Sequence, residues 1–376
     1  MITKIEVKNV KAINNCEINF NKSKYQYRED MIFNEHYVNP IAFYGANGSG
    51  KSSILESVLQ LTLLLNNEPD NIYPLVPNFV NFGLVVPQKE NYKYSKNISS
   101  YVKLFFTLNE KTEYIYKIET KLYPREIVSE VLIKNGEIVF DRKITKYKYR
   151  NKEFDVQSPL FPTLRALYNE HNDETITECF NFLSNIAFVD ASTKRYKFKA
   201  ALQKNHLDII VEKSAEIKSI LNKYKEFPLY DVFSNTSELG KKDYLASIKL
   251  DKGELILPYG YISSGMANQN VILATLLSLP KNGVLIIDEI EDALHPLTIL
   301  DFLKVVKEKN IQLIFSSHNT FILQKLRPDQ IYFANWKNGF SSYKRLSDIY
   351  PNIREINNIE KMYLSNCFEE DIKKDE

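Results

Sequence analysis

An eight-residue segment, Gly45–Ser52, limits the folds open to this chain more than any other feature. It reads GANGSGKS and fits the pattern G-x-x-x-x-G-K-[ST] at every position. The apolar run Ile41–Tyr44 precedes it, and Ser52–Leu65 carries apolar residues at helical spacing. A glycine-rich loop between a strand and a helix can wrap its backbone N–H groups around a phosphate chain. We therefore predict a buried strand, a phosphate-binding loop and a helix, in that order.

The residue types in this loop suit a nucleoside triphosphate. The Lys51 ammonium can reach the β- and γ-phosphates, and the Ser52 hydroxyl can ligate Mg²⁺, a cation that prefers oxygen ligands. The expected cofactors are ATP and Mg²⁺. The expected nucleotide contacts in this segment are Gly45, Asn47, Gly48, Ser49, Gly50, Lys51, Ser52 and Ser53.

A second motif lies far along the chain at Gly283–Glu289. It is an apolar strand that ends in two acids, Asp288 and Glu289. Asp288 can hold Mg²⁺ through a water molecule, and Glu289 can polarise the attacking water as a general base. Such a strand end alone is a weak signal, but together with the loop it predicts a hydrolytic site.

Two further segments fit the same chemistry. His318 stands at the carboxyl end of the predicted strand Ile311–Ser316, 30 residues after Asp288, where an imidazole can donate to a γ-phosphate. Ser264 and Gly265 open the predicted helix Ser263–Leu279, and a helix start of this kind leaves backbone N–H groups free for an anion.

Strand and helix patterns organise the rest of the chain. The first 20 residues alternate as two strands around a turn near Asn14-Asn15, and Tyr101–Arg142 reads as an antiparallel meander. Strand and helix patterns alternate from Ser263 onward, which predicts a parallel sheet covered on both faces. We divide the α/β chain into 1–142 and 259–345 as the two parts of one ATPase lobe, a mainly helical insert at 143–258, and a tail at 346–376.

Composition excludes some classes of protein. The 376 residues carry a net charge of only +2, so no basic footprint covers the whole chain. Two basic stretches, Lys143–Lys152 and Lys194–Lys199, contain interleaved tyrosines and leave nucleic acid open as a partner; a solvated surface is the alternative. Three scattered cysteines, no signal peptide and no long apolar run predict a soluble, cytoplasmic chain without a membrane partner.

The order of these motifs resembles the ABC-type ATPases, and within them the branch that contains SMC, RecF and OLD (overcoming-lysogenisation-defect) proteins. Glu291–Pro296 is similar to the D-loop of that branch, and Ile5–Ile13 to its opening strand and turn. Asn358–Leu364 resembles a short segment of stand-alone bacterial ATPases, many of them encoded in phage-defence loci. The implied fold is an ABC-type P-loop head with an antiparallel β subdomain and a helical insert.

The resemblance also implies a mechanism in which two copies of the chain sandwich two ATP molecules. Each site would join Ser264 and Gly265 of one copy to five residues of the other: Lys51, Ser52, Asp288, Glu289 and His318.

Some features depart from the family pattern. The signature segment Ser263–Gln269 lacks the two glycines of the transporter form, which argues against a transport ATPase. Gln88 is the one candidate for the glutamine that couples ATP to a partner. The chain lacks a long coiled-coil pattern and a TOPRIM nuclease segment.

Three hypotheses follow. The first is a sensor or regulator in bacterial anti-phage defence that acts with a separate effector, a nuclease or toxin. The alternative is a RecF-like repair or recombination ATPase that clamps DNA. The third is a scaffold locked by ATP with slow turnover.

Overall fold

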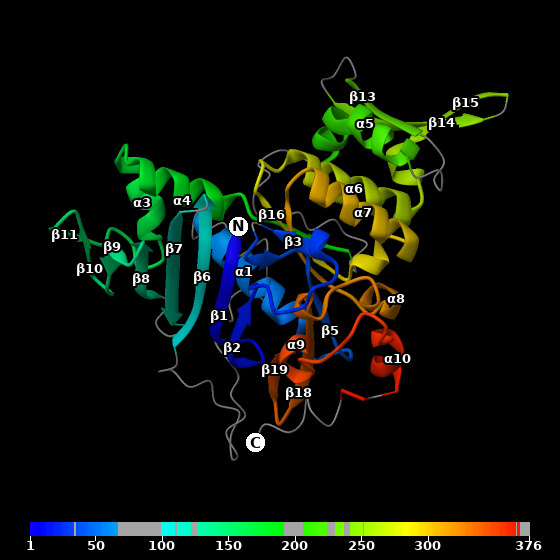
Figure 1. The fold of residues 1–376 in the computed structure, drawn as a ribbon. Helices are drawn as coiled ribbons and strands as arrows, with labels where there is room; N and C mark the ends of the chain where they lie inside the picture. Colours follow the sequence, from blue (N-terminus) through cyan, green and yellow to red (C-terminus); the bar gives the residue numbers. More distant parts are fainter. Residues whose placement is uncertain are drawn as a thin grey trace.

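A computed structural model gives the fold, shown in Figure 1. The residues that it describes are 1–33, 35–66, 99–109, 111–121, 126–191, 206–223, 230–236, 241–250, 252–365 and 367–368. Gln88 and the basic stretch Lys194–Lys199 lie outside the described residues.

A six-stranded central sheet forms the middle of the molecule. Its order is β12-β16-β17-β5-β18-β19. Neighbouring strands are parallel except for β18 and β19, which form an antiparallel hairpin. The strands are β5 (Ile41–Tyr44), β12 (Ala187–Asp190), β16 (Val284–Asp288), β17 (Gln312–Ser316), β18 (Ile331–Lys337) and β19 (Phe340–Arg345). The strand before the glycine-rich loop is thus enclosed by strands from the last third of the chain.

One face of the central sheet is covered by α1 (Lys51–Asn66), which is buried nearly all round. Its sequence is apolar on every side, as expected for a helix between two layers. The second layer is an eight-stranded antiparallel sheet of order β11-β10-β9-β8-β7-β6-β1-β2. Its strands are β1 (Ile2–Val10), β2 (Ile13–Asn19), β6 (Ser99–Asn109), β7 (Thr112–Lys121), β8 (Glu126–Lys134), β9 (Glu137–Arg142), β10 (Lys146–Tyr149) and β11 (Lys152–Asp155).

This antiparallel sheet confirms the predicted meander. The β8–β9 turn is Asn135-Gly136, with both residues at positive φ, as a tight hairpin turn requires. The predicted turn at Asn14-Asn15 is wrong by three residues. The chain turns at Lys11-Ala12, where Lys11 takes φ 52° and Val10 pairs with Ile13.

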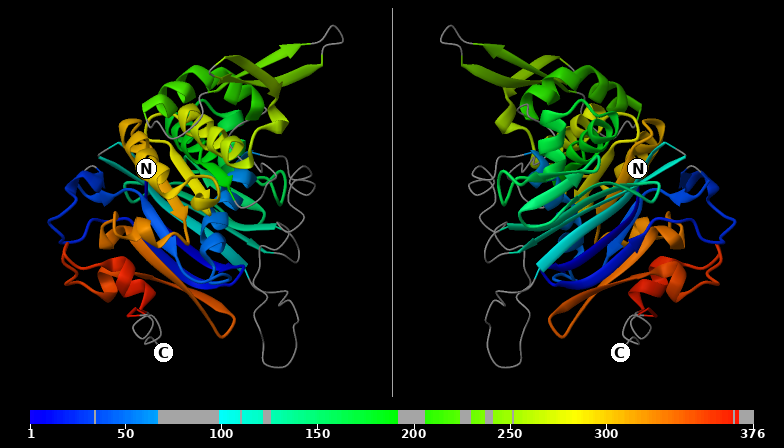
Figure 2. Two further views of the ribbon diagram at one scale, coloured as in Figure 1. Left: turned by 90° about the vertical axis from the view of Figure 1, so that its right-hand side faces the viewer. Right: turned by 90° about the vertical axis from the view of Figure 1, so that its left-hand side faces the viewer.

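Helices cover the other face of the central sheet, as Figures 1 and 2 show. They are α6 (Ser264–Ser278), α7 (Pro296–Glu308), α8 (Thr320–Leu323) and α10 (Ile359–Leu364). Phe333 of β18 stacks on Tyr363 and on Phe368, so the C-terminal segment packs onto the sheet. Both faces are therefore covered, as the alternating pattern predicted.

The segment 143–258, predicted as mainly helical, contains as much strand as helix in its described part. It holds α3 (Thr163–Glu170), α4 (Glu174–Ser184), α5 (His206–Lys223), and the strands β13 (Tyr230–Thr236), β14 (Lys242–Leu250) and β15 (Gly253–Pro258). These three strands form their own sheet, which stands with α5 at the top of Figure 1. The segment also supplies β10, β11 and β12 to the two large sheets, because the apolar run at 187–189 is buried beside β16.

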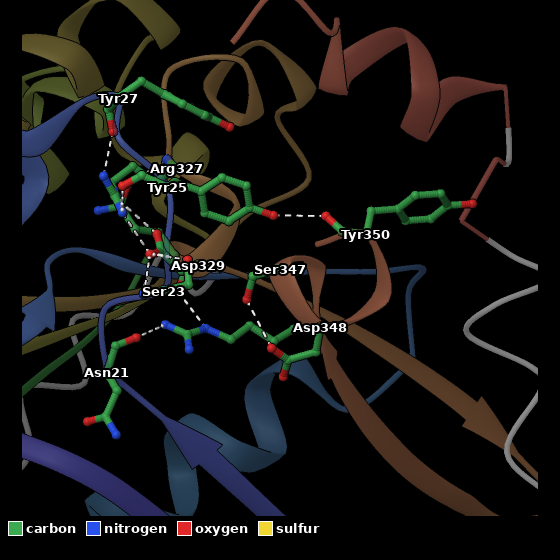
Figure 3. A network of polar contacts seen from close by, with 11 residues as sticks. Asn21, Ser23, Tyr25, Tyr27, Arg327, Asp329, Ser347, Asp348 and Tyr350 are labelled. Carbon is green, nitrogen blue, oxygen red and sulfur yellow. Dashed lines mark hydrogen bonds and ion pairs between the residues drawn. The ribbon is translucent and has the colours of Figure 1, made fainter. Parts of the chain in front are cut away.

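A buried ionic network ties residues 21–27 to the segment after β17 (Figure 3). Arg327 and Asp329 are both fully buried and form a bidentate pair with N···O distances of 2.9 Å. The Asp329 carboxylate also accepts from the Ser23 N–H and hydroxyl, while Arg327 donates to the Tyr25 and Tyr27 carbonyls. The guanidinium and the carboxylate of this pair both have further hydrogen-bond partners, which is the condition for a stable buried pair.

The remaining elements are short: β3 (Ile32–Phe33), β4 (Tyr37–Val38), α9 (Leu346–Ile349), and four 3-10 turns at Glu29–Met31, Tyr259–Tyr261, Ile290–Asp292 and Pro328–Gln330. Among the described residues, no helix combines the length and apolar character needed to cross a membrane. Cys16, Cys179 and Cys367 are free thiols, as their scatter predicted.

Candidate functional site

The glycine-rich loop connects the carboxyl end of β5 to α1, as predicted. Gly45, Gly48 and Gly50 have φ of 152°, 77° and 103°, values that side-chain-bearing residues rarely adopt. A Cβ at Gly45 would lie 2.3 Å from the Ala334 carbonyl oxygen, and one at Gly50 would lie 2.2 Å from the Ser341 hydroxyl. The loop can keep this tight shape only with glycine at these two positions.

The glycine-rich loop carries two buried polar side chains, Lys51 and Ser49. The Lys51 ammonium, which is buried, donates to the carbonyls of Gly45 at 3.1 Å and Ala46 at 3.2 Å. Burial lowers the pKa of Lys51, although the carboxylates of Asp288 and Glu289 oppose that shift. Ser49 Oγ is buried and has no hydrogen-bond partner among the described residues. The loop thus holds a cation and an unsatisfied hydroxyl.

The acidic end of β16 lies directly beneath this loop. The Ser52 hydroxyl, at the start of α1, interacts with the Asp288 carboxylate and acts to lower its pKa. Ser316, at the end of β17, also donates to Asp288 and accepts from the Glu289 N–H at 2.8 Å. Burial raises the pKa of Asp288, while the bonds from Ser316 and Ser52 oppose the shift. Two motifs more than 230 residues apart are therefore joined by one hydroxyl–carboxylate contact.

Glu289 leaves the strand in a left-handed conformation with φ 54°. This conformation is unusual for a residue with a side chain, and it carries the half-buried carboxyl group out of the strand direction. Burial raises the pKa of Glu289, and the negative charges of Asp288, Asp292 and Glu291 raise it further. A glutamate with a raised pKa is a better proton acceptor near neutral pH than an ordinary one.

His318 stands two residues beyond β17, where the sequence placed it. Its backbone N–H donates to Glu291, and its side chain is exposed. Burial of part of the ring and the positive charge of Lys51 lower its pKa, while Glu291 and Asp288 oppose the shift. The lowered pKa favours the neutral imidazole, which can donate one N–H.

Ser264 and Gly265 open α6, as predicted. Ser263 is the N-cap residue, and its hydroxyl accepts from the Met266 N–H at 3.3 Å. Ser263, Ser264 and Gly265 are exposed, and no atom lies within 4 Å of a Cβ built on Gly265. Within the described chain, neither Ser264 nor Gly265 has a hydrogen bond to the glycine-rich loop. This helix start is thus open to solvent.

Three residues at this edge were not predicted to act there. Asp190 ends β12 and pairs in register with Asp288, and the signal was present as a second apolar strand ending in an acid. Ser316 lies within a motif that we had assigned to His318 alone. Lys11, at the β1–β2 turn, forms an ion pair with Glu56 of α1 and interacts electrostatically with Asp288, which no sequence motif indicates.

The basic stretch Lys143–Lys152 does not offer its tyrosines to a nucleic acid, and its cations fit the solvated surface that was the alternative. The side chains of Tyr147 and Tyr149 are 7% and 3% exposed, so their rings are core residues and unavailable for stacking on bases. Three of the cations form ion pairs with acids. The pairs are Lys143–Asp141 at 3.2 Å, Lys146–Glu153 at 2.6 Å and Arg150–Asp173 at 2.6 Å. Pairing of β10 with β9 buries every second residue of β10. The alternation of lysine and tyrosine in the sequence fits this buried strand as well as it fits a nucleic-acid face.

The residues at this edge fit a triphosphate and a magnesium ion. The loop offers backbone N–H groups in a glycine-dependent curve, the Lys51 ammonium and the unsatisfied Ser49 hydroxyl. The Ser52 hydroxyl and the Asp288 carboxylate already meet, and both are oxygen ligands of the type that Mg²⁺ prefers.

Comparisons with known proteins give a family and a fold. A family model described as "AAA domain, putative AbiEii toxin, Type IV TA system" matches residues 41–324. No curated protein matches the chain. An SMC head bound to the C-winged helix domain of ScpA is similar, with TM-score 0.51 and 15% identity over 91% of this chain and 96% of that chain. The SMC head with an extended coiled coil from Pyrococcus furiosus gives TM-score 0.50 and 13% identity over 99% of each chain.

A RecF structure matches at TM-score 0.43 and 11% identity over 91% of this chain and 98% of that chain, a score too low to support an inference. At these identities the SMC heads show a shared fold. That fold is the mixed α/β head with a large antiparallel sheet that the motif order predicted.

Proposed function

The chain belongs to the AAA domain family described as putative AbiEii toxin, Type IV TA system, an ABC/SMC-like ATPase family, and from that premise we propose that it binds Mg²⁺-ATP at Gly45–Ser53 and hydrolyses it. One observation carries the proposal. The first hydroxyl of α1, on Ser52, interacts with the buried carboxylate at the end of β16, on Asp288, and the carboxyl group of Glu289 follows directly in the chain.

Each residue has a role that follows from its chemistry. The N–H groups of Gly45–Gly50 and the Lys51 ammonium bind the phosphates, with Asn47 and Ser53 as further contacts. Ser52 and Asp288 hold Mg²⁺, which neutralises charge on the phosphates when it is bound. Glu289 accepts a proton from the attacking water, and its raised pKa suits that task.

His318 contributes a neutral N–H donor toward the γ-phosphate. Its lowered pKa favours the uncharged ring, which can donate from one nitrogen and accept at the other. Ser316 positions both carboxylates, because it bonds to Asp288 and to the Glu289 backbone at once.

We propose further that two copies of the chain close around ATP. The start of α6 supports this, because Ser264 and Gly265 are exposed in the first turn of the helix, where backbone N–H groups lack acceptors within the helix. A helix N-terminus attracts negative charge, and the γ-phosphate of a second copy supplies it. ATP would then stabilise the pair, and hydrolysis would release it.

The cellular role that we propose is a sensor or regulator in bacterial anti-phage defence, acting with a separate effector protein. Two observations support it: the family model, whose description names a type IV toxin–antitoxin system, and the C-terminal segment Asn358–Leu364, which forms α10 against the sheet. Growth of cells that express the chain alone tests whether the effector is separate. Arrest of growth without any second protein would assign the toxic activity to this chain.

A paired measurement tests the biochemical proposal. With ATP and Mg²⁺, the wild-type chain should release phosphate, and Glu289→Gln should bind ATP, lose turnover and elute as a dimer in size-exclusion chromatography with light scattering. Lys51→Ala should fail to bind ATP and stay monomeric. Phosphate release by Glu289→Gln at the wild-type rate would refute the assignment of the base. Dimers that form equally without nucleotide would refute ATP as the stabilising ligand.

A further inference from the structure

Trp336 is the single tryptophan of the chain, and its side chain is 55% exposed. It lies on β18, two residues after Ala334 and one residue before the end of the strand. A large aromatic side chain that stays exposed is unusual, because burying it would remove a large apolar area from water. Trp336 lies on the hairpin that packs on the glycine-rich loop, which indicates a role in ligand binding.

The β18–β19 hairpin packs directly on that loop. The Tyr343 hydroxyl donates to the Gly50 carbonyl at 2.7 Å, and the Ser341 hydroxyl fills the space beside the Gly50 α-carbon. Tyr343 pairs with Ala334, and Ser341 pairs with Trp336. Residues directly opposite each other in an antiparallel pair point to the same face of the sheet. The indole therefore lies on the loop-facing side of the hairpin, next to the side chain that touches Gly50.

The same hairpin also touches the β1–β2 turn. The Ser341 N–H donates to the Ala12 carbonyl at 2.7 Å. The preceding residue, Lys11, interacts electrostatically with Asp288, so this turn borders the phosphate end of the site. Trp336 thus stands at the junction of the loop, the turn and solvent.

We propose that the Trp336 indole forms one wall of the base subsite, on which the purine ring of the bound nucleotide stacks. This inference rests on the proposed function. A planar π-surface with one open face suits a purine, because bases stack on aromatic side chains and gain dispersion and apolar contact. The phosphates would lie in the glycine-rich loop and the base beside the hairpin that supports that loop.

The test compares ligands with and without a base. The ligands are ATP and inorganic tripolyphosphate, each with Mg²⁺, titrated against the wild-type chain, Trp336→Ala and Trp336→Phe. We expect Trp336→Ala to weaken ATP binding about tenfold or more and to leave tripolyphosphate binding unchanged. Trp336→Phe should restore most of the ATP affinity. Ile356→Ala is the matched control, because Ile356 is 86% exposed and outside the site.

The single tryptophan gives a direct readout as well. ATP should quench its fluorescence in the wild-type chain with the same dissociation constant as the titration, and tripolyphosphate should leave the fluorescence unchanged. If Trp336→Ala leaves ATP affinity unchanged, or weakens binding of both ligands equally, the purine does not stack on Trp336. Either result would leave the proposed function standing. A wild-type chain that binds neither ligand would refute the proposed function and this inference with it.

Discussion

Ser316→Ala is the substitution that most directly tests the geometry of the acidic strand end. The serine is fully buried, and its hydroxyl both donates to Asp288 and accepts from the Glu289 N–H. Alanine removes both hydrogen bonds with almost no change in volume. The buried Asp288 carboxylate then loses the hydroxyl donor on Ser316, and the Glu289 N–H loses its acceptor.

The expected loss can be estimated from these two bonds. A hydrogen bond to a charged group contributes about 1.5–3 kcal/mol, and a barrier change of about 1.4 kcal/mol alters a rate tenfold. If the bonds act in positioning the two carboxylates, kcat should fall about 10- to 100-fold. ATP binding should change little, because the loop and Lys51 are untouched. The change should therefore be in kcat rather than in the dissociation constant for ATP.

The assay is phosphate release at saturating ATP across a range of Mg²⁺ concentrations. Ser317→Ala is the matched control: Ser317 is also fully buried, but its hydroxyl accepts from the Asn319 N–H at 2.9 Å and has no hydrogen bond to Asp288 or Glu289. Turnover by Ser316→Ala within twofold of the wild-type rate, or an equal loss in Ser317→Ala, would show that the Ser316 hydroxyl does not position the site.

Three other predictions concern the glycine-rich loop, the general base Glu289 and the buried ion pair of Arg327 with Asp329. Gly50→Ala should lower the melting temperature and abolish ATP binding, because its Cβ would meet Ser341 at 2.2 Å. Gly48→Ala, with open space around it, should cost only the ~1–2 kcal/mol of its left-handed φ, and equal effects of the two variants would contradict this reading.

The acid limb of the kcat–pH profile should lie above the ~4.3 of an ordinary glutamate, because burial and neighbouring acids raise the pKa of Glu289; a limb at or below that value argues against Glu289 as the base. For Asp329, burial opposes ionisation, but the hydrogen bonds from Arg327 and Ser23 together outweigh it and lower the pKa. The stabilising contribution of Asp329 is therefore present above pH ~4 and is lost as pH falls through the lower folded value. Asp329→Asn should destabilise the fold at pH 7 by about 3–5 kcal/mol and flatten the acid dependence of urea unfolding; an unchanged acid dependence would exclude Asp329 as its source.

The sequence predicted the parts of the fold that depend on local pattern. The glycine-rich loop, the meander with its Asn135-Gly136 turn and the apolar strand before Asp288 all carry their signal within a few residues. The β1–β2 turn was misplaced because Asn14-Asn15 has good turn residues, whereas pairing of Val10 with Ile13 decides where the chain reverses.

The sequence did not predict contacts between segments that lie far apart in the chain. Ser316 and Asp190 act through neighbours in the sheet, and register across β12, β16 and β17 is not encoded in any single segment. Lys11 reaches the site only because the antiparallel sheet places its first turn there. The tyrosines at 147 and 149 looked available for stacking, because alternation shows that residues point to opposite faces but not which face is covered.

The strand order of the central sheet sets a condition on how the chain can fold during synthesis. The strand that leads into the glycine-rich loop, β5, pairs with β17 and β18, whose residues are made about 270 and 290 positions later. A nascent chain on the ribosome therefore carries the nucleotide-loop sequence long before it can hold that loop in shape. Pairing over such separations is slow, and the exposed edges of β5 invite association with other chains meanwhile. We therefore expect the central sheet to close only after β17 and β18 have been made.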